Sequence, residues 1–306
     1  MSFDIVVVGS IVQDLVSYTK SFPRPGESVI GSSFEAGPGG KGANQAAQCA
    51  RLGGKVLMIG RVGSDIFAPL NIESLKHSGV AVDYIEKDEV VNTSTAMITV
   101  TSENTVVVTL GANLELLPER IEQLESVIAA SKIMLCQFEI QSATLLKALE
   151  VAKRTNVKTF FNFAPPVPDF DKSALKLVDY LCTNESETEF LSGREVKSVD
   201  DAIEAAKSLL SYGPTAIIVT MGGQGAVLAT KEAVKHISVP PVKAVDTTGA
   251  GDSFCGSLAY LLVYKPELTL EEQVRRACLV ASISVQKKGT QNSYPWAKDL
   301  PAEWLS

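Results

Sequence analysis

The sequence predicts an α/β fold, in which a mainly parallel sheet has helices on both faces and a small β-sheet lid is added. Strand-like apolar runs alternate with helical stretches along the chain, which is the pattern of a covered parallel sheet. Two early segments break the alternation with hairpin patterns. The 306 residues suffice for one large α/β core with a small appendage. We therefore expect one domain over residues 1–306, with lid strands inserted at about 16–36 and 94–110.

The expected strands of the large sheet are short apolar runs. They lie at residues 4–8, 55–59, 132–136, 159–162, 180–183 and 216–220. Helical stretches separate or follow them, at residues 42–52, 66–77, 142–155, 199–210, 251–264 and 270–285. This order repeats too regularly for an α+β fold, and no internal repeat or long linker interrupts it.

The expected lid consists of two hairpins. The first pairs residues 16–18 with 28–36 across the Pro- and Gly-containing turn at 22–26. The second pairs residues 94–101 with 105–110 across the turn-prone residues 102–104. Four such strands can form a small separate sheet, and an exposed apolar face on it would favour a dimer.

Composition excludes several classes of function. The net charge is −7 without a Lys/Arg cluster, which argues against a nucleic-acid surface. No apolar run approaches the roughly 18 residues that span a bilayer, and residues 3–9 resemble a first strand rather than a signal peptide. Five scattered cysteines fit a reducing compartment, so we expect a cytoplasmic protein, with a nuclear presence left open. Only two histidines occur, so catalysis is expected from carboxylates, amides and lysine.

A segment near the C-terminal end combines two carboxylates with a run of small residues. Asp246 and Asp252 bracket Thr-Thr-Gly-Ala-Gly, and an apolar helical pattern follows immediately. Gly249 and Gly251 let a ligand approach the backbone and expose the first amides of the helix, where the helix dipole also favours an anion. An anion site beside a carboxylate suits phosphoryl transfer. The alternative is an ordinary Asp/Gly loop that caps a helix.

Four sequence motifs lie along the chain in a fixed order. They are Gly-Pro-Gly-Gly-Lys-Gly-Ala-Asn-Gln-Ala-Ala at 37–47, Asn-Glu-Ser-Glu at 184–187, Thr-Met-Gly-Gly-Gln-Gly at 220–225 and Asp-Thr-Thr-Gly-Ala-Gly-Asp-Ser-Phe at 246–254. In these motifs the chain resembles the ribokinase-like carbohydrate kinase family, over roughly residues 5 to 296. The ending Gly-Thr-Gln-Asn-Ser-Tyr-Pro at 289–295 resembles the ribokinase branch. The resemblance implies a lid over the sugar that also forms a dimer contact.

The resemblance implies a sugar site made of carboxylates, amides and backbone. Asp14 and Glu139 each follow a predicted strand, where ligands of α/β proteins lie. By resemblance, Asp14 binds the ring hydroxyls and Glu139 lies near the anomeric side. The other implied sugar contacts are Gly40, Lys41, Gly42, Asn44 and Asp252. The chain departs from the family at Val12, where many ribokinases carry asparagine, so one sugar contact is either missing or moved to the backbone.

The resemblance also implies an ATP site without a Walker-type loop, and no Gly-x-x-x-x-Gly-Lys-Ser/Thr occurs in the chain. The implied ATP-binding residues are Asn184, Thr220, Gly222, Gly223, Gly225, Gly251 and Cys278. Related enzymes tend to carry a polar residue at the position of Cys278, which bears on nucleotide affinity. Mg²⁺ is expected to bind largely through the phosphates, with Glu187 acting through water.

An activating K⁺ is a separate implication of the resemblance. Potassium sites need several oxygens, many of them backbone carbonyls. The implied ligands are Asp246, Thr248, Ser284, Lys287, Gly289 and Ser293. Lys287 would contribute its carbonyl oxygen and not its ammonium group.

The resemblance therefore predicts ATP-dependent phosphorylation of D-ribose at the 5-hydroxyl, giving D-ribose 5-phosphate. Asp252 is the expected base, and the amides of Gly249, Ala250 and Gly251 form the expected anion hole. The alternatives are another acceptor of the family (2-deoxyribose, fructose or adenosine) and a sugar-binding sensor without catalysis. An oxidoreductase is disfavoured, because Gly-x-Gly-x-x-Gly does not follow the first strand. The expected partners are ATP, D-ribose and a second copy of the chain at the lid, with no nucleic acid and no membrane.

Overall fold

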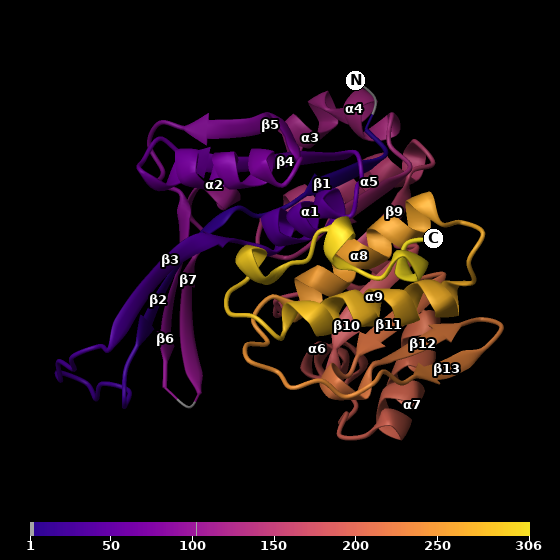
Figure 1. Cartoon of the computed structure of the whole chain (residues 1–306). Helices are drawn as coiled ribbons and strands as arrows, with labels where there is room; N and C mark the ends of the chain where they lie inside the picture. Colours follow the sequence, from indigo (N-terminus) through magenta and orange to yellow (C-terminus); the bar gives the residue numbers. More distant parts are fainter. Residues whose placement is uncertain (1–2, 102) are drawn as a thin grey trace.

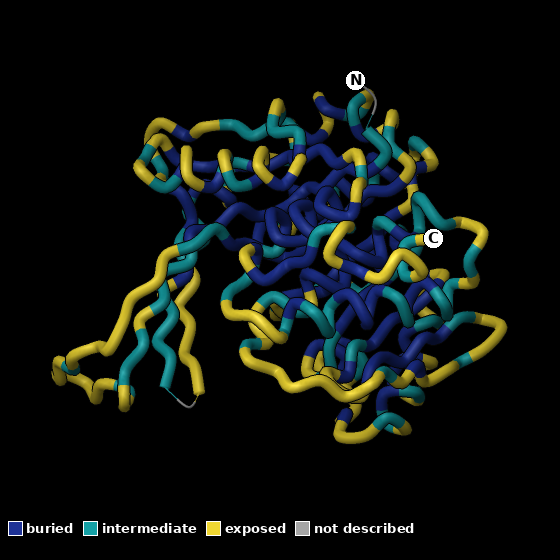
Figure 2. The backbone as a smooth tube through the Cα atoms, viewed as in Figure 1, coloured by how far each residue is buried: buried dark blue, intermediate teal, exposed yellow. Residues whose placement is uncertain are grey.

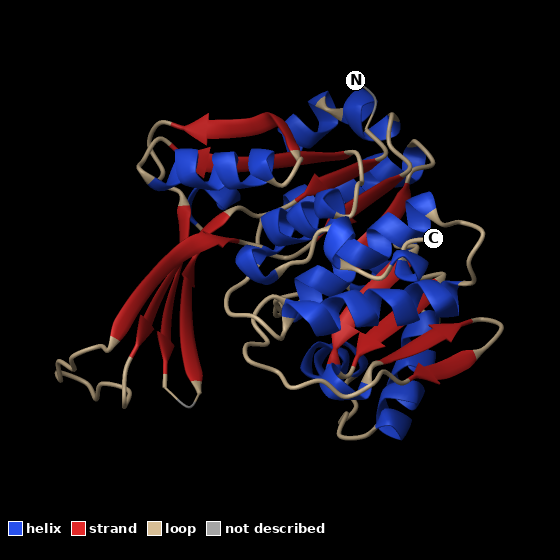
Figure 3. Cartoon of the chain, viewed as in Figure 1, coloured by secondary structure: helices blue, strands red, loops and turns tan. Residues whose placement is uncertain are grey.

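The computed structural model describes residues 3–101 and 103–306 and consists of two sheets with helices (Figures 1 and 3). The large sheet has nine strands in the order β13-β12-β11-β10-β9-β8-β1-β4-β5. Neighbours pair in parallel from β11 to β5, whereas β12 and β13 add an antiparallel edge. The predicted α/β class with a small additional sheet is confirmed.

The strands of the large sheet are mostly short. Their bounds are β1 Ile5–Val8, β4 Val56–Gly63, β5 Ala81–Asp88, β8 Ile133–Cys136, β9 Lys158–Asn162, β10 Tyr180–Asn184, β11 Ala216–Thr220, β12 Ala226–Thr230 and β13 Val234–Ile237. Each of the six predicted strands corresponds to one of them. Sequence patterns missed β5, β12 and β13. β5 and β13 are the two edge strands, where solvent exposure weakens the continuous apolar pattern of a doubly covered strand. β12 is an inner, mostly buried strand of only five residues.

The α-helices follow the predicted stretches within one or two residues. Their bounds are α1 Lys41–Arg51, α2 Phe67–His77, α3 Pro118–Gln123, α4 Glu125–Ala129, α5 Ser142–Arg154, α6 Glu185–Ser192, α7 Val199–Leu210, α8 Ala250–Tyr264 and α9 Leu270–Ser284. The helices α3, α4 and α6 were not predicted as elements, and their eight or fewer residues give too short a periodic pattern.

The core has two layers, one on each face of the large sheet. Ile5 and Val7 of β1 pack with α1, α8 and α9, whereas Val6 and Val8 pack with α5 and α7 on the opposite face. This division follows from the alternation of side chains along a strand. All four residues are fully buried, as the dark central strands of Figure 2 show. Because these strands pair in parallel, the carboxyl ends of β1, β8, β10 and β11 lie along the same edge of the sheet.

The small sheet has the order β3-β2-β6-β7 and projects from the main body as a lid (Figure 1). Its strands are β2 Val12–Tyr18, β3 Ser33–Gly39, β6 Ser94–Val100 and β7 Asn104–Thr109. The first hairpin differs from the prediction, because pairing begins at Val12 with Gly39 and residues 28–32 are not part of the strand. Asp14 consequently lies within a lid strand. Of the predicted second turn, residue 102 lies outside the described residues.

None of the helices in the described ranges combines the length and apolar character needed to cross a bilayer.

Candidate active site

At the amino-terminal end of α8, the Gly251 N–H has no backbone partner among the described residues and Gly251 borders open space, whereas the Ala250 N–H, predicted as an anion-hole donor, donates to the Thr247 carbonyl (3.1 Å). Gly249 precedes the helix with a left-handed backbone (φ 74°), and its carbonyl accepts a hydrogen bond from the Tyr294 hydroxyl (2.9 Å). A Cβ at Gly249 would lie 2.5 Å from that hydroxyl oxygen, so the turn requires glycine. A Cβ at Gly251 would meet no atom within 4 Å. The first turn of α8 therefore offers N–H groups to an anion, with room for that anion beside Gly251.

Asp252 lies in this first turn, and its carboxylate is held by two side-chain amides of α1. Asn44 Nδ2 donates to Oδ2 (2.9 Å) and Gln45 Nε2 donates to Oδ1 (3.0 Å). Asp252 is only 7% exposed and lines a cavity of about 180 Å³ together with Lys41, Asn184 and other residues. A carboxylate fixed at both oxygens beside free helix amides is placed as a general base next to an anion site.

Lys41 begins α1 and faces the same cavity. Burial by itself lowers the pKa of Lys41, but the carboxylates of Asp252, Glu139 and Glu187 more than offset this effect and raise the pKa overall. The ammonium group therefore stays charged. A positive charge between an acceptor site and an anion site can stabilise a phosphoryl group in transfer.

Glu139 follows β8 and is anchored by the start of α1. Its Oε2 accepts hydrogen bonds from the Ser10 hydroxyl (2.5 Å) and from the Lys41 backbone N–H (2.9 Å). The Ser10 hydroxyl also accepts the N–H of Gly42 (3.2 Å). A Cβ at Gly42 would lie 2.6 Å from the Ser10 nitrogen, so this glycine lets α1 pack directly on the end of β1. Gly40, which precedes α1, has a left-handed backbone (φ 89°).

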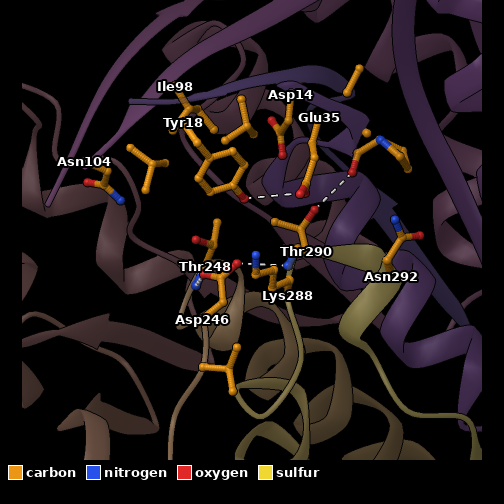
Figure 4. Close-up of a pocket in the computed structure, with 17 residues that line it drawn as sticks. Asp14, Tyr18, Glu35, Ile98, Asn104, Asp246, Thr248, Lys288, Thr290 and Asn292 are labelled. Atoms are coloured by element: carbon orange, nitrogen blue, oxygen red, sulfur yellow. Dashed lines mark hydrogen bonds between the residues drawn. The ribbon is translucent and has the colours of Figure 1, made fainter. Parts of the chain in front are cut away.

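Asp14 lines a neighbouring cavity of about 210 Å³ between the lid and the C-terminal loops. In Figure 4, Asp14 and Tyr18 from the lid face Asp246 and Thr290 from these loops across the cavity. Burial raises the pKa of Asp14 to about 7, and the nearby carboxylates of Glu139 and Asp252 add to the rise. A partly buried carboxylate that lines a cavity is suited to accept hydrogen bonds from ligand hydroxyls.

A third cavity, of about 290 Å³, lies on the other side of the α8 amino terminus and contains most of the predicted ATP-binding residues. They are Thr220, Gly222, Gly223, Gly225, Gly251 and Cys278. Pro240 and Val242 contribute apolar surface to this cavity, as suits a flat aromatic base. Gly225 has φ 89°, and a Cβ there would lie 2.0 Å from the Ile237 carbonyl oxygen. Burial raises the pKa of Cys278 to about 12, so its thiol is neutral.

Asn184 and Glu187 form a capping box at the start of α6. Asn184 Oδ1 accepts the Glu187 N–H (2.8 Å), and Glu187 Oε2 accepts the Asn184 N–H (2.9 Å). Both residues also line the cavity of Asp252, and burial raises the pKa of Glu187 to about 7. One carboxylate facing the phosphate region suits a hydrated Mg²⁺, which takes few protein ligands.

The residues predicted for K⁺ lie on two segments that run side by side. The N–H groups of Val245 and Asp246 donate to the Val285 carbonyl (2.7 and 3.1 Å), and the Gly289 N–H donates to Asp246 Oδ2 (2.9 Å). Thr248 N–H donates to Asp246 Oδ1 (2.9 Å). The other predicted residues make local hydrogen bonds: the Lys287 N–H donates to the Ser284 carbonyl, and the Ser293 hydroxyl donates to the Thr290 carbonyl.

The Asp246 carboxylate remains charged at neutral pH. Burial alone raises its pKa, but the hydrogen bonds from Thr248 and Gly289, with the positive charge of Lys288, more than offset this effect and lower it overall. A charged carboxylate among loop carbonyls is a donor set that fits a monovalent cation.

Three functional residues escaped the sequence interpretation. Gln45 holds Asp252, Tyr294 shapes the turn before α8, and Ser10 holds Glu139. For Gln45 the sequence did contain a signal. Its side-chain amide lies within the buried stretch of α1, and a buried amide requires hydrogen-bond partners. The contacts of Tyr294 and Ser10 join segments 45 and 129 residues apart, which no local pattern reveals.

Comparisons with known proteins agree with this geometry. Residues 2–297 match the pfkB family carbohydrate kinases. The chain is 46% identical to the ribokinase of Mus musculus over 97% of this chain and 93% of that protein. It is 39% identical to the deoxyribokinase of Salmonella typhi over 95% of each. The structure of Arabidopsis thaliana ribokinase complexed with ribose and ATP superimposes with a TM-score of 0.90 at 28% identity, covering 100% of this chain and 99% of that one. The chain therefore belongs to the pfkB family of carbohydrate kinases.

Proposed function

We propose that this kinase transfers the γ-phosphoryl group of ATP to the 5-hydroxyl of D-ribose and thereby makes D-ribose 5-phosphate. The observation that carries the proposal is the position of Asp252, whose carboxylate lines the 180 Å³ cavity beside the free amide of Gly251 at the start of α8. The similarity to ribokinases over nearly the whole chain supports ribose as the acceptor.

In the proposed reaction, Asp252 accepts the proton of the 5-hydroxyl as the oxygen attacks the γ-phosphorus and the bond to ADP breaks. The amides of Gly249 and Gly251 would donate to the phosphoryl oxygens, and the charged Lys41 lies beside them. The predicted third donor, the Ala250 N–H, is bound to the Thr247 carbonyl (3.1 Å) and would have to leave it. Mg²⁺ with ATP would neutralise phosphate charge, and Glu187 would hold its water shell. Asn44 and Gln45 keep the carboxylate oriented throughout.

The sugar site is proposed to consist of Asp14, Asn44 and Glu139, with backbone groups at Gly40. The K⁺ site is proposed at Asp246 and the neighbouring carbonyls of the 284–293 segment, where it would fix the loop before α8. All five cysteines are unpaired, which supports a reducing compartment and hence a cytoplasmic location.

A second acceptor, 2-deoxyribose, is favoured by one observation. Val12 is 2% exposed and offers no side-chain hydrogen bond where many ribokinases have asparagine. A site that lacks a polar partner for one hydroxyl discriminates weakly against a sugar lacking that hydroxyl. The similarity to a deoxyribokinase supports the same alternative.

A phosphorylation screen tests the proposed function. Purified protein is incubated with ATP, Mg²⁺ and single acceptors (pentoses, hexoses and nucleosides), with and without K⁺, and ADP release is measured. We expect the highest kcat/KM with D-ribose and measurable turnover of 2-deoxyribose. Turnover of a nucleoside or hexose above both pentoses would contradict the proposal, and binding of ribose without any turnover would indicate a sensor.

A further inference from the structure

A chain of buried side-chain amides ends on the carboxylate of Asp252. Gln45 Nε2 donates to Asp252 Oδ1 (3.0 Å), and Gln137 Nε2 donates to Gln45 Oε1 (2.7 Å). Gln45 is 1% exposed and Gln137 is fully buried. Gln137 Oε1 has no hydrogen-bond donor among the described residues, and a Cβ at Gly9 would lie 2.2 Å from it. We call Gln137 and Gln45 the amide chain.

The charge of Asp252 fixes the direction of the amide chain. A carboxylate only accepts hydrogen bonds, so Gln45 must turn its NH₂ group toward Asp252 and its Oε1 toward Gln137. Gln137 must then present its own NH₂ group, which leaves its carbonyl oxygen unpaired against Gly9. An unpaired buried carbonyl is unfavourable, and the opposite orientation would place Gln45 Oε1 against a charged carboxylate, which is worse.

A second arm holds the other oxygen of the carboxylate. Asn44 Nδ2 donates to Asp252 Oδ2 (2.9 Å), and Gln291 Nε2 donates to Asn44 Oδ1 (3.1 Å). The Ser74 hydroxyl in turn donates to Gln291 Oε1 (2.9 Å). This arm ends on a satisfied acceptor, whereas the amide chain does not. Gln45 Nε2 also donates to Asn162 Oδ1 (3.1 Å), so the orientation of Gln45 depends on this acceptor together with the donor that Gln137 supplies.

We propose that Gln45 and Gln137 are positioning residues for phosphoryl transfer. They hold the plane of the Asp252 carboxylate so that its remaining lone pairs face the 180 Å³ cavity that Asp252 lines. Gln137 acts through Gln45, without a hydrogen bond to Asp252. The proposal rests on the proposed function, because it takes Asp252 as the base. It concerns turnover and not affinity, since neither glutamine lines the sugar or nucleotide cavities described above.

The first test replaces Gln45 by Met, which keeps a similar volume but neither donates nor accepts in the amide chain. We expect kcat to fall about 10- to 100-fold, the range for loss of a hydrogen bond to a charged group. KM for the sugar and for ATP should change less than about twofold, because the binding groups remain. An unchanged kcat, or a KM effect as large as the kcat effect, would overturn the proposal.

The second test compares Gln137→Glu with Gln137→Met. An ionised Glu at 137 would attract the NH₂ group of Gln45 and turn its Oε1 toward Asp252, whereas a protonated Glu would donate to Gln45 and restore the chain. Burial raises the pKa of such a carboxyl. The ratio of variant to wild-type kcat for Gln137→Glu should therefore fall at least severalfold from pH 6 to pH 9. The ratio for Gln137→Met should stay constant, because methionine does not titrate.

Thermal unfolding and calorimetric sugar affinity are measured for each variant, so that a folding defect is not taken for a catalytic one. A pH-independent ratio for a folded Gln137→Glu would refute the role of Gln137. The ratios of variant to wild-type kcat are measured with the sugar that the wild-type protein phosphorylates best. A wild type without kinase activity would refute the proposed function itself, whereas an active wild type with insensitive variants would refute only the amide chain.

Discussion

Individual carboxylates of this site differ in their surroundings, and the surroundings define their roles. Asp252 is held by two amide donors, Glu139 by a hydroxyl and a backbone N–H, and Asp246 by two backbone N–H groups. Asp14 is partly buried near two other carboxylates, and its pKa is raised to about 7. Asp252, Glu139 and Asp246 are each fixed in orientation by two hydrogen bonds, whereas Asp14 gains most from a ligand that supplies donors.

The first prediction concerns Asp252→Asn. The asparagine keeps the size of the side chain but cannot accept the hydroxyl proton as a base. We expect kcat to fall about 10²- to 10⁴-fold, while sugar affinity measured by calorimetry stays nearly unchanged. Near-normal turnover of this variant would remove Asp252 from the role of base.

Asp14 gives a prediction on affinity. Asp14→Ala removes an acceptor for sugar hydroxyls, so ribose affinity should fall about 10- to 150-fold, the range for a charged hydrogen bond. ATP affinity should hardly change, since Asp14 lies outside the nucleotide cavity. An equal loss for both ligands in calorimetry would contradict the assigned site.

The raised pKa of Asp14 also gives a prediction on stability. In the unfolded chain the carboxyl ionises near its ordinary value of 3.8, whereas in the folded, ligand-free protein it ionises near 7. The folded state holds the extra proton between these values, so this group's contribution to the free energy of unfolding decreases as the pH rises from about 4 to about 7. Asp14→Asn should therefore raise the melting temperature at pH 8 more than at pH 5. A difference that is equal at both pH values would show that Asp14 titrates normally.

At the scale of the element, the start of α8 depends on two glycines for different reasons. Gly249 is required by its backbone and by the Tyr294 hydroxyl, whereas Gly251 faces open space. The first glycine builds the turn, and the second leaves room for a ligand. The start of α8 thus contains one glycine that its backbone conformation requires and one that we expect ligand binding to require.

Matched alanine variants test this separation. Gly249→Ala places a Cβ 2.5 Å from the Tyr294 oxygen in a left-handed turn, so the free energy of unfolding should fall by about 1–3 kcal/mol. Gly251→Ala should unfold like the wild type, but its methyl group would occupy the anion space and lower kcat. Calorimetric unfolding and steady-state kinetics measure the two effects. Destabilisation by Gly251→Ala would show that the helix start is more crowded than the structure indicates.

At the scale of the whole molecule, both faces of the lid carry apolar side chains. On the face that carries Asp14, Val16, Ile98 and Val106 are cross-strand neighbours, and Val106 is 49% exposed. On the opposite face, Leu15, Met97 and Val107 are cross-strand neighbours, and Met97 and Val107 are 63% and 65% exposed. A continuous exposed apolar stripe favours contact with a second copy.

We predict that the protein is a dimer through the exposed apolar rows of the lid. Val106→Glu or Met97→Glu should shift the molar mass measured by light scattering to that of a monomer, and the variant that does so identifies the face in contact. Phe190→Glu, at a position 45% exposed on α6 and outside the lid, should leave the dimer intact and serves as the control. A monomeric wild type would contradict the prediction.

The two loop segments at Asp246 lead to a prediction about K⁺. Replacing K⁺ by choline at constant ionic strength and Mg²⁺ should lower kcat severalfold, because the ion would fix the loop that precedes α8. Asp246→Ala should cause a similar loss that added K⁺ does not restore. Equal turnover in K⁺ and choline at saturating ribose and ATP would remove the cation site and leave the roles of Asp252 and α8 standing.

The sequence by itself determined the alternation of the main strands and helices, the glycine turns and the place of Asp252 in the first turn of a helix. These features depend on local backbone requirements and on short-range periodicity, which a single segment carries. Only the tertiary structure decided that β2 begins at Val12, that Tyr294 supports Gly249 and that Gln45 and Gln137 lead to Asp252. The side-chain hydrogen bonds of Gln45 span 207, 117 and 92 residues along the chain, so their partners are set by how β8, β9, α1 and α8 pack together. A local pattern shows that a buried amide needs partners, but only the packing of distant elements selects them.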